Sequence, residues 1–208
     1  MDSAPSSPPT ARAVRTRRKL LDAMVDLLAE KGLSSATPAA IASRAGISRT
    51  AYLYHYPNGV TLFADLADHV REAILAHFDA AGRPPPGAEA SDHAIDTYWL
   101  LLSEPVFLAF LELRSASRFD ADVASAVSGL IADFDSGRLG GRFGAFAQAG
   151  EDPRFQTSRD LGRFLLEGLA RGDLTYDVED RRRRLIEVVK RAVRSLNRRG
   201  GVPDLWPG

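Results

Sequence analysis

Apolar residues recur at intervals of three and four along most of this 208-residue chain. That interval is the period of an amphipathic α-helix, whereas the strict alternation of a half-buried strand is missing from the sequence. We therefore predict an all-α protein. The spacing predicts helices over residues 11–31, 38–45, 49–54, 59–81, 91–102, 105–118, 121–134, 157–171 and 177–197, with a further possible helix over 141–149.

Proline and glycine mark the boundaries between these segments. Residues 83–87, Arg-Pro-Pro-Pro-Gly, form the clearest joint and are predicted to be a rigid linker. Residues 1–10 have no apolar core, so they are predicted to be a disordered tail and not a secretory signal. We expect an N-terminal domain over residues 11–58, a larger helical domain over 59–198 and a frayed tail over 199–208.

Composition removes several classes of function. The chain has no cysteine, which excludes disulfides, thiolate zinc sites and cysteine nucleophiles, and fits a cytoplasmic location. No apolar run reaches the roughly 18 residues of a membrane helix, so no membrane partner is expected. A Gly-rich phosphate loop, an H-E-x-x-H motif and a G-x-S-x-G motif are missing from the sequence, so no cofactor is expected.

Charge is distributed unevenly, although the formal net charge is zero. Of 27 basic and 27 acidic residues, eight bases and four acids lie in residues 1–60, which leaves 19 bases and 23 acids for the rest. Five of those eight bases lie between Arg12 and Lys19. A basic end on a mildly acidic body is typical of a nucleic-acid-binding module, and a solvated helix start is the alternative.

Two short helices within residues 37–56 have the features of a helix-turn-helix. Thr37 is a good N-cap with Pro38 as the first helical residue, and Ser48 is a good N-cap for the next helix. Gly46 supplies the turn between them, and Ile47 is expected to point into the core. The second helix of such a pair inserts its N-terminal residues into the DNA major groove.

The second of these helices divides into two faces. Arg49, Thr50 and Tyr54 are expected on its outer face, where arginine reads guanine, threonine contacts thymine methyl groups and hydroxyls contact phosphates. Tyr52 and Tyr56 are expected to face the core instead. His55 and Arg44 are evenly balanced between DNA contact and a purely structural or solvated role.

Residues 16–66 resemble the N-terminal domain of the TetR family of repressors. The resemblance rests on TRRKLLDA at residues 16–23, LAEKG at 28–32, IASRAGISRTAYLYHY at 41–56 and LF at 62–63. It implies binding to double-stranded DNA with a pseudo-palindromic operator. The DNA-contacting residues expected from the resemblance and from the motif are Arg17, Thr37, Arg44, Ser48, Arg49, Thr50, Ala51, Tyr54 and His55.

Two positions depart from the family pattern. Leu53 stands where the family often has tyrosine, and Gly59 stands where it often has lysine; both family residues usually contact phosphate. Their absence is expected to weaken the sequence-independent part of binding. The basic segment from Arg12 to Lys19 is expected to compensate through phosphate or minor-groove contacts.

The resemblance further implies a ligand-sensing and dimerising C-terminal region. The family's last two helices usually form the homodimer interface, with packing inside the protomer as the alternative here. The expected interface residues are Leu161, Phe164, Leu165, Gly168, Leu185, Val189, Ala192 and Leu196. An unidentified small molecule, lipophilic or aromatic, is expected in a pocket whose apolar walls suit such a ligand, although for any single one of these residues a core role is favoured. The expected pocket residues are Tyr98, Trp99, Phe107, Phe110, Leu111 and Phe134.

Two other functions are compatible with parts of the sequence. A helical interaction protein with a degenerate helix-turn-helix is one, since Leu53 and Gly59 lack the expected phosphate-binding groups. A metal-dependent enzyme is the other, because Asp65, Asp68, His69 and Glu72 lie at helical spacing. An acidic helix face with one histidine is more often simply solvated, so we do not expect an enzyme.

Overall fold

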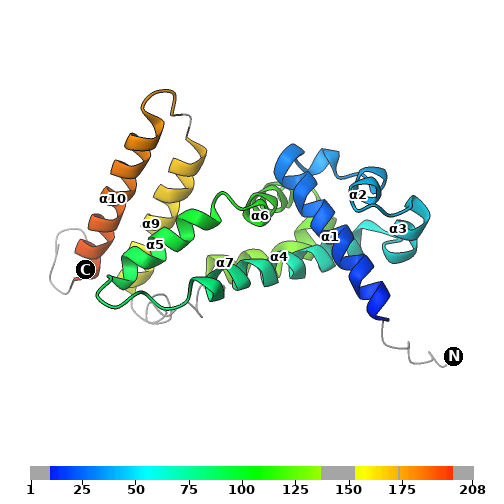
Figure 1. Ribbon diagram of the computed structural model, residues 1–208, viewed down its shortest axis with the longest axis horizontal. Coiled ribbons are helices and arrows are strands. Elements are labelled where there is room, and N and C mark those ends of the chain that lie inside the picture. Colours follow the sequence, from blue (N-terminus) through cyan, green and yellow to red (C-terminus); the bar gives the residue numbers. More distant parts are fainter. Residues whose placement is uncertain (1–9, 137–152, 173, 199–208) are drawn as a thin grey trace. The chain divides into compact units, whose positions relative to one another are not determined.

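The computed structural model describes residues 10–136, 153–172 and 174–198, and every regular element within these ranges is helical (Figure 1). The prediction of an all-α protein is confirmed. The possible helix at 141–149 and the predicted tails at 1–9 and 199–208 lie outside the described residues. The elements are α1 (Ala11–Lys31), the 3-10 helix η1 (Leu33–Ser35), α2 (Pro38–Arg44), α3 (Arg49–His55), α4 (Gly59–Ala81), α5 (Ala90–Leu101), α6 (Pro105–Ala116), α7 (Ala121–Asp135), α9 (Pro153–Arg171) and α10 (Val178–Asn197).

Helix boundaries follow the capping signals in the sequence. Asn58 accepts a hydrogen bond from the backbone N–H of Thr61 at 3.0 Å and so caps the start of α4. The helix predicted over 157–171 begins earlier, at Pro153. Proline is favoured in the first turn of a helix because its missing N–H would have no partner there. The proline thus marks the start of α9 more accurately than the apolar pattern does.

The chain divides into two compact units. Unit 1 comprises Met1–Arg71 and Pro105–Leu130, and unit 2 comprises Glu72–Glu104 and Ile131–Gly208. Helix α4 therefore contributes its first half to unit 1 and its second half to unit 2. The division at residue 58 that the sequence suggests concerns function, and it stays a prediction.

The core of unit 1 is built on α1, which packs against α2 and α6 (Figure 1). Leu20, Met24 and Leu28 follow one another at four-residue intervals on α1 and are almost fully buried. Phe107 and Phe110 of α6 are also fully buried, with ring centroids 5.7 Å apart. These buried side chains lie where α1 and α6 pack together. Helix α2 packs on α1 in turn, and α3 packs on α2.

Unit 2 contains α5, α9 and α10, of which α9 and α10 lie side by side (Figure 1). Leu166, Val189 and Val193 are buried between these helices and their neighbours. The buried Tyr98 hydroxyl of α5 donates a hydrogen bond to the buried Glu167 carboxylate of α9 at 2.8 Å. A buried carboxylate needs such a donor, because losing its hydration without a partner is costly.

In the described part of the chain, helix length and hydropathy limit which segments could cross a membrane, and the positions of carboxylates and histidines limit where a metal could bind. No single helix there is long and apolar enough to cross a membrane, although the consecutive helices α5 and α6 taken together reach the length and composition. Within the same residues, no group of three or more metal-ligating side chains could hold a metal ion. His69 of the suggested metal cluster is instead 2.9 Å from Asp22 of α1.

Candidate DNA interface

The two short helices of unit 1 are each capped by the residue that the sequence suggests. The Thr37 hydroxyl accepts a hydrogen bond from the N–H of Ala40 at 3.2 Å, and Pro38 is the first residue of α2. The Ser48 hydroxyl accepts one from the N–H of Ala51, also at 3.2 Å. Helices of seven residues are not stable alone, so these caps hold them together with the packing of α2 on α1 and of α3 on α2.

The cap at Ser48 leads to a stability prediction. Ser48→Ala is expected to lower the free energy of unfolding by about 1 kcal/mol, because the Ala51 N–H loses its acceptor at an exposed helix start. Denaturant unfolding followed by circular dichroism measures this. Ser43→Ala, at an exposed position within α2, is the matched control and should change stability far less. Equal effects of the two substitutions would contradict a capping role for Ser48.

The turn between α2 and α3 requires glycine at one position. Gly46 has a φ of +65°, in the left-handed region that side chains disfavour, and a Cβ there would meet no atom within 4 Å. The requirement is therefore one of backbone conformation and not of space. The next residue, Ile47, is half-buried and donates its N–H to the Ala42 carbonyl at 2.9 Å, which closes the turn.

Helix α3 has one buried and one exposed face. Tyr52 and Tyr56 are buried with ring centroids 6.1 Å apart, which confirms that they serve the core, and burial raises the pKa of the Tyr52 hydroxyl. Arg49, Thr50 and Tyr54 are exposed, with Tyr54 83% exposed. The face that the sequence assigns to DNA is thus the one that points to solvent.

Arg44, at the end of α2, is held by carboxylates of α1. Its guanidinium donates two hydrogen bonds to Glu30, one of them 2.7 Å long, and lies 3.6 Å from Asp26. The hydrogen bond to Glu30 raises the pKa of Arg44, and the same bond lowers the pKa of Glu30. A bidentate pair of this kind fixes the orientation of both groups. A phosphate contact by Arg44 stays a prediction, and the pairing of Glu30 with Arg44 was not predicted.

The other end of α3 is surrounded by polar groups from α1 and α4. Arg17 lies 3.5 Å from Asp65, and Tyr56 donates its hydroxyl to the same oxygen of Asp65 at 3.0 Å. Burial, followed by the nearby Arg17 cation, lowers the pKa of His55 and so disfavours its charged form. The pairing of Asp65 with Tyr56 was not predicted from the sequence, since the two residues are nine positions apart.

The six residues proposed for the ligand pocket fall in both units. Phe107, Phe110 and Leu111 belong to α6 in unit 1, where the two phenylalanines are core residues. In unit 2, Tyr98 and Phe134 come together with ring centroids 6.4 Å apart. The sixth, Trp99, is half-buried on α5 of unit 2. The ligand pocket stays a prediction.

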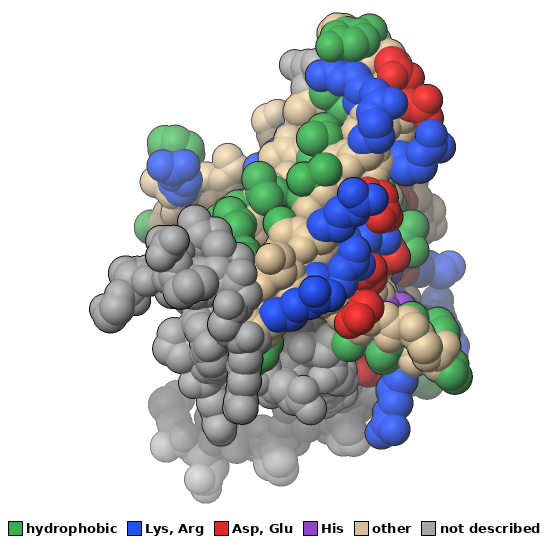
Figure 2. All heavy atoms as spheres, turned by 90° about the vertical axis from the view of Figure 1, so that its left-hand side faces the viewer, with side chains coloured by type: hydrophobic (Ala, Val, Ile, Leu, Met, Phe, Trp, Pro, Cys, Tyr) green, Lys and Arg blue, Asp and Glu red, His purple; other side chains and the backbone are tan. Residues whose placement is uncertain are grey.

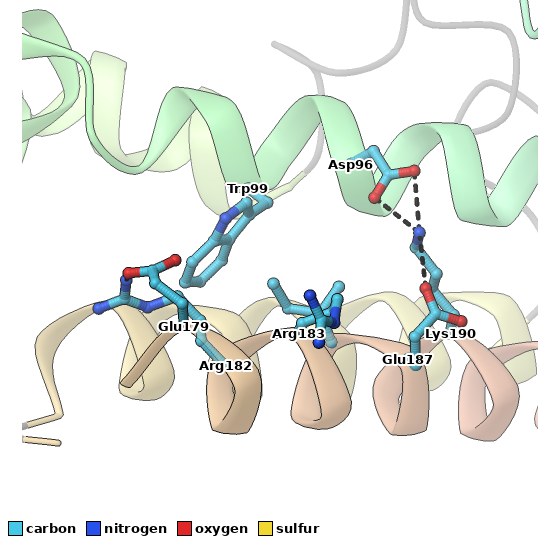
Figure 3. A pocket seen from close by; sticks show the side chains of 8 residues that line it. Asp96, Trp99, Glu179, Arg182, Arg183, Glu187 and Lys190 are labelled. Atoms are coloured by element: carbon cyan, nitrogen blue, oxygen red, sulfur yellow. Dashed lines mark hydrogen bonds and ion pairs between the residues drawn. The ribbon is translucent and has the colours of Figure 1, made fainter. Parts of the chain in front are cut away.

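Trp99 lines a shallow groove of about 300 Å³ between α5 and α10 (Figure 3). Figure 3 shows Trp99 and Asp96 projecting from α5 toward α10, with Lys190 joined to Asp96 and Glu187. The guanidinium of Arg182 lies 5.9 Å from the Trp99 ring centroid. The groove is lined by groups that pair with one another, so it forms a polar contact between the two helices.

The residues expected at a dimer interface differ in exposure. Leu161, Phe164 and Leu165 of α9 are exposed, with Phe164 60% exposed, and Gly168 is exposed beside them. On α10 Leu185 is exposed, and so is Val188 one turn further along the helix. Figure 2 shows hydrophobic side chains along this side of unit 2, next to a row of charged ones. The remaining residues of the expected interface are Val189, which is buried within the protomer, and Ala192 and Leu196, which are half-buried.

Comparisons with known proteins agree with this geometry. The family described as bacterial regulatory proteins, tetR family, matches residues 20–66. A transcriptional regulator from Rhodococcus sp. Rha1 superposes with a TM-score of 0.64 at 18% identity, over 86% of this chain and 95% of the other. GusR of Salmonella enterica gives a TM-score of 0.62 at 16% identity, over 93% and 98%. The multidrug binding protein EbrR complexed with malachite green gives 0.57 at 19%, over 85% and 96%. No curated protein matches the sequence.

A capped helix-turn-helix with an outward polar face, set on a helical body, defines a DNA-binding transcriptional regulator. The matched residues 20–66 contain this motif together with the buried half of α1 and the start of α4. Residues 20–66 match the DNA-binding domain of the tetR family, and the chain shares its overall fold with the transcriptional regulators on which it superposes.

Proposed function

We propose that this protein is a repressor that binds a pseudo-palindromic operator as a homodimer. The observation that carries the proposal is the outer face of α3, where Arg49, Thr50 and Tyr54 are solvent-exposed while the tyrosines on the inner face are buried. Side chains at the start of such a helix reach base edges in the major groove. Two copies reading successive major grooves need a two-fold dimer, with half-sites about 34–36 Å apart.

The exposed apolar side chains of α9 and α10 support the dimer. Phe164 and Val188 are 60% and 59% exposed, and three leucines around them are also exposed. Contiguous exposed apolar surface of this kind typically marks an interaction site. A two-fold contact with a second copy would remove this apolar surface from water. It would also give the two-fold symmetry that a pseudo-palindromic operator requires.

A small lipophilic or aromatic molecule is proposed to release the repressor from DNA. Unit 2 contains aromatic groups suited to such a ligand, and the structurally similar EbrR is a multidrug binding protein seen with malachite green and with imidazole. Helix α4 belongs to both units, so a change in unit 2 has a continuous path to the helices that carry the DNA-binding face. The ligand would favour a conformer of the dimer whose recognition helices no longer match the groove spacing.

The proposal is tested by DNA selection followed by titration. The purified chain is incubated with a pool of random-sequence duplexes, and the tightest-binding duplex is measured by fluorescence anisotropy at two salt concentrations. A sequence-specific, salt-steep isotherm is expected. Aromatic compounds that include malachite green are then screened for release of that duplex. Failure to select any sequence would favour the helical interaction protein as the alternative function.

The basic start of α1 is predicted to strengthen binding to every DNA sequence. Arg12 and Arg15 are exposed, and the arginines would offset the phosphate contacts missing at Leu53 and Gly59. The double variant Arg12→Ala, Arg15→Ala is expected to bind all duplexes more weakly than the wild type. It should also reduce the slope of log K against log salt by about 0.9 for each phosphate that the arginines no longer neutralise.

Removal of two exposed arginines from α10 is the matched control. Arg183 and Arg184 are 72% and 62% exposed and belong to unit 2. Their double change to alanine removes the same charge and should leave the salt slope as it is in the wild type. An unchanged slope for the α1 variant would show that this segment makes no phosphate contact.

A further inference from the structure

One carboxylate in unit 1, that of Asp65, joins three helices. It lies on the second turn of α4, and its Oδ2 accepts the hydroxyl of Tyr56 at 3.0 Å. The same oxygen lies 3.5 Å from an Nη atom of Arg17 on α1, whose guanidinium is 5.7 Å from the Tyr56 ring centroid. Tyr56 is the C-terminal cap of α3. Asp65 therefore connects the end of the recognition helix to α1 and α4.

The orientation of α3 depends on contacts of this kind. The helix has seven residues, too few to be stable alone, so its direction is set by what its inner face contacts. Tyr56 is 1% exposed, and an apolar contact alone would leave its ring able to slide along α4. A hydrogen bond to an ionised acceptor is directional and stronger than one between neutral groups, so it fixes the ring at one place.

The negative charge of Asp65 is expected to weaken DNA binding, whereas its hydrogen bond to Tyr56 is expected to strengthen it. Arg17 is exposed, with 45% of its side chain accessible, and Asp65 neutralises part of its charge next to the DNA-facing helix. A carboxylate near this surface also repels phosphate directly. Considered only as a charge, Asp65 should weaken DNA binding. Considered as an anchor for Tyr56, it should strengthen binding to the one sequence that the helix is oriented to read.

The geometry points to Asp65 as a positioning residue for sequence-specific DNA recognition, acting through Tyr56 and Arg17 without contacting the bases. The inference rests on the proposed function, since it assumes that α3 reads DNA. Removing the anchor therefore weakens binding to the preferred duplex and leaves binding to other DNA unchanged or tighter. A merely structural role would lower both affinities together.

The test uses the full chain and two DNA probes. The specific probe is the tightest duplex that the wild type recovers from a random-sequence pool, and the non-specific probe is poly(dI-dC). Tyr56→Phe, Asp65→Asn and the double variant are compared with the control Asp68→Asn, which removes another α4 carboxylate that is exposed and paired with Arg71. Every assay is run at a temperature at which melting curves show each variant fully folded.

Tyr56→Phe is expected to lower the affinity for the specific probe about tenfold and to change the affinity for poly(dI-dC) less than about twofold. The reason is that the hydroxyl orients the helix but carries no charge. Asp65→Asn should also lower the affinity for the specific probe, and it should raise the affinity for poly(dI-dC). The double variant should be little worse than either single one, since both remove the same interaction. Asp68→Asn should keep the wild-type ratio of the two affinities.

The possible failures are distinguishable. If the wild type recovers no preferred duplex, the proposed function is overturned and this inference with it. If the wild type recovers one and the ratio of affinities is unchanged in Tyr56→Phe and Asp65→Asn, the positioning role alone is overturned. An equal decrease on both probes also overturns it, because that result indicates a general structural defect.

Discussion

Replacing Phe164 with glutamate is expected to dissociate the proposed homodimer into monomers and to abolish its tight binding to the selected duplex. Phe164 is the most exposed apolar side chain on α9, and the Arg163 guanidinium lies 4.6 Å from its ring centroid. Burial of a phenylalanine in an interface contributes about 1.5–3 kcal/mol, and a carboxylate at the same place would lose its hydration without a designed partner. Two-fold symmetry would place two such changes in one interface.

The dimer dissociation constant is expected to rise at least about 100-fold, which corresponds to roughly 3 kcal/mol. Sedimentation equilibrium measures the dimer directly, and anisotropy with the selected duplex measures its consequence for DNA binding. Val188→Glu on α10 should have the same effect, because Val188 is similarly exposed on the adjacent helix. Since both side chains are exposed in the protomer, each variant should stay folded and keep the helical circular dichroism spectrum of the wild type.

Phe119→Glu is the matched control for this prediction. Phe119 lies between α6 and α7 in unit 1 and is 89% exposed, so the same substitution there adds the same charge to the surface. It should change neither the oligomeric state nor the binding of the selected duplex. A wild-type chain that sediments as a monomer at micromolar concentration, or a Phe164→Glu variant that stays dimeric, would contradict the proposed interface.

Helix positions were predictable because their determinants are local. The periodicity of apolar residues and the caps at Thr37 and Ser48 act within one turn of the chain, and the structure confirms both caps. The burial of Tyr52 and Tyr56 was predictable for the same reason, since residues four positions apart share one face of a helix. Local sequence thus defines most of the helix-turn-helix.

Pairings between distant residues were not predictable from one sequence. The sequence alone does not indicate which acidic residue pairs with Arg44. The packing of α2 on α1 brings it to Glu30. Tyr98 and Glu167 are 69 positions apart, and nothing local to either residue indicates their hydrogen bond. Aromatic residues that fill a core and those that line a pocket have the same sequence pattern. The contacts of the C-terminal helices were therefore predicted less completely than the helix-turn-helix.

Arg49→Ala is expected to weaken binding to the selected duplex and to relax the choice of base at one position in each half-site. Arg49 is the first residue of α3 and is exposed, and a bidentate arginine–guanine contact contributes about 1–3 kcal/mol of discrimination. The expected decrease in affinity per half-site is therefore roughly 5- to 150-fold. Competition with duplexes that carry each base substitution in turn measures where discrimination disappears.

Arg12→Ala separates base reading from phosphate binding in the same experiment. Both variants remove one exposed arginine from unit 1, so their net charges are equal. Arg12→Ala should weaken all duplexes by a similar factor and preserve their rank order, because phosphate contacts carry no sequence information. Arg49→Ala should change the rank order at one symmetric pair of positions. If Arg49→Ala instead lowers every affinity equally and reduces the salt slope by about one, Arg49 contacts phosphate, and base reading falls to Thr50 and its neighbours on the outer face of α3.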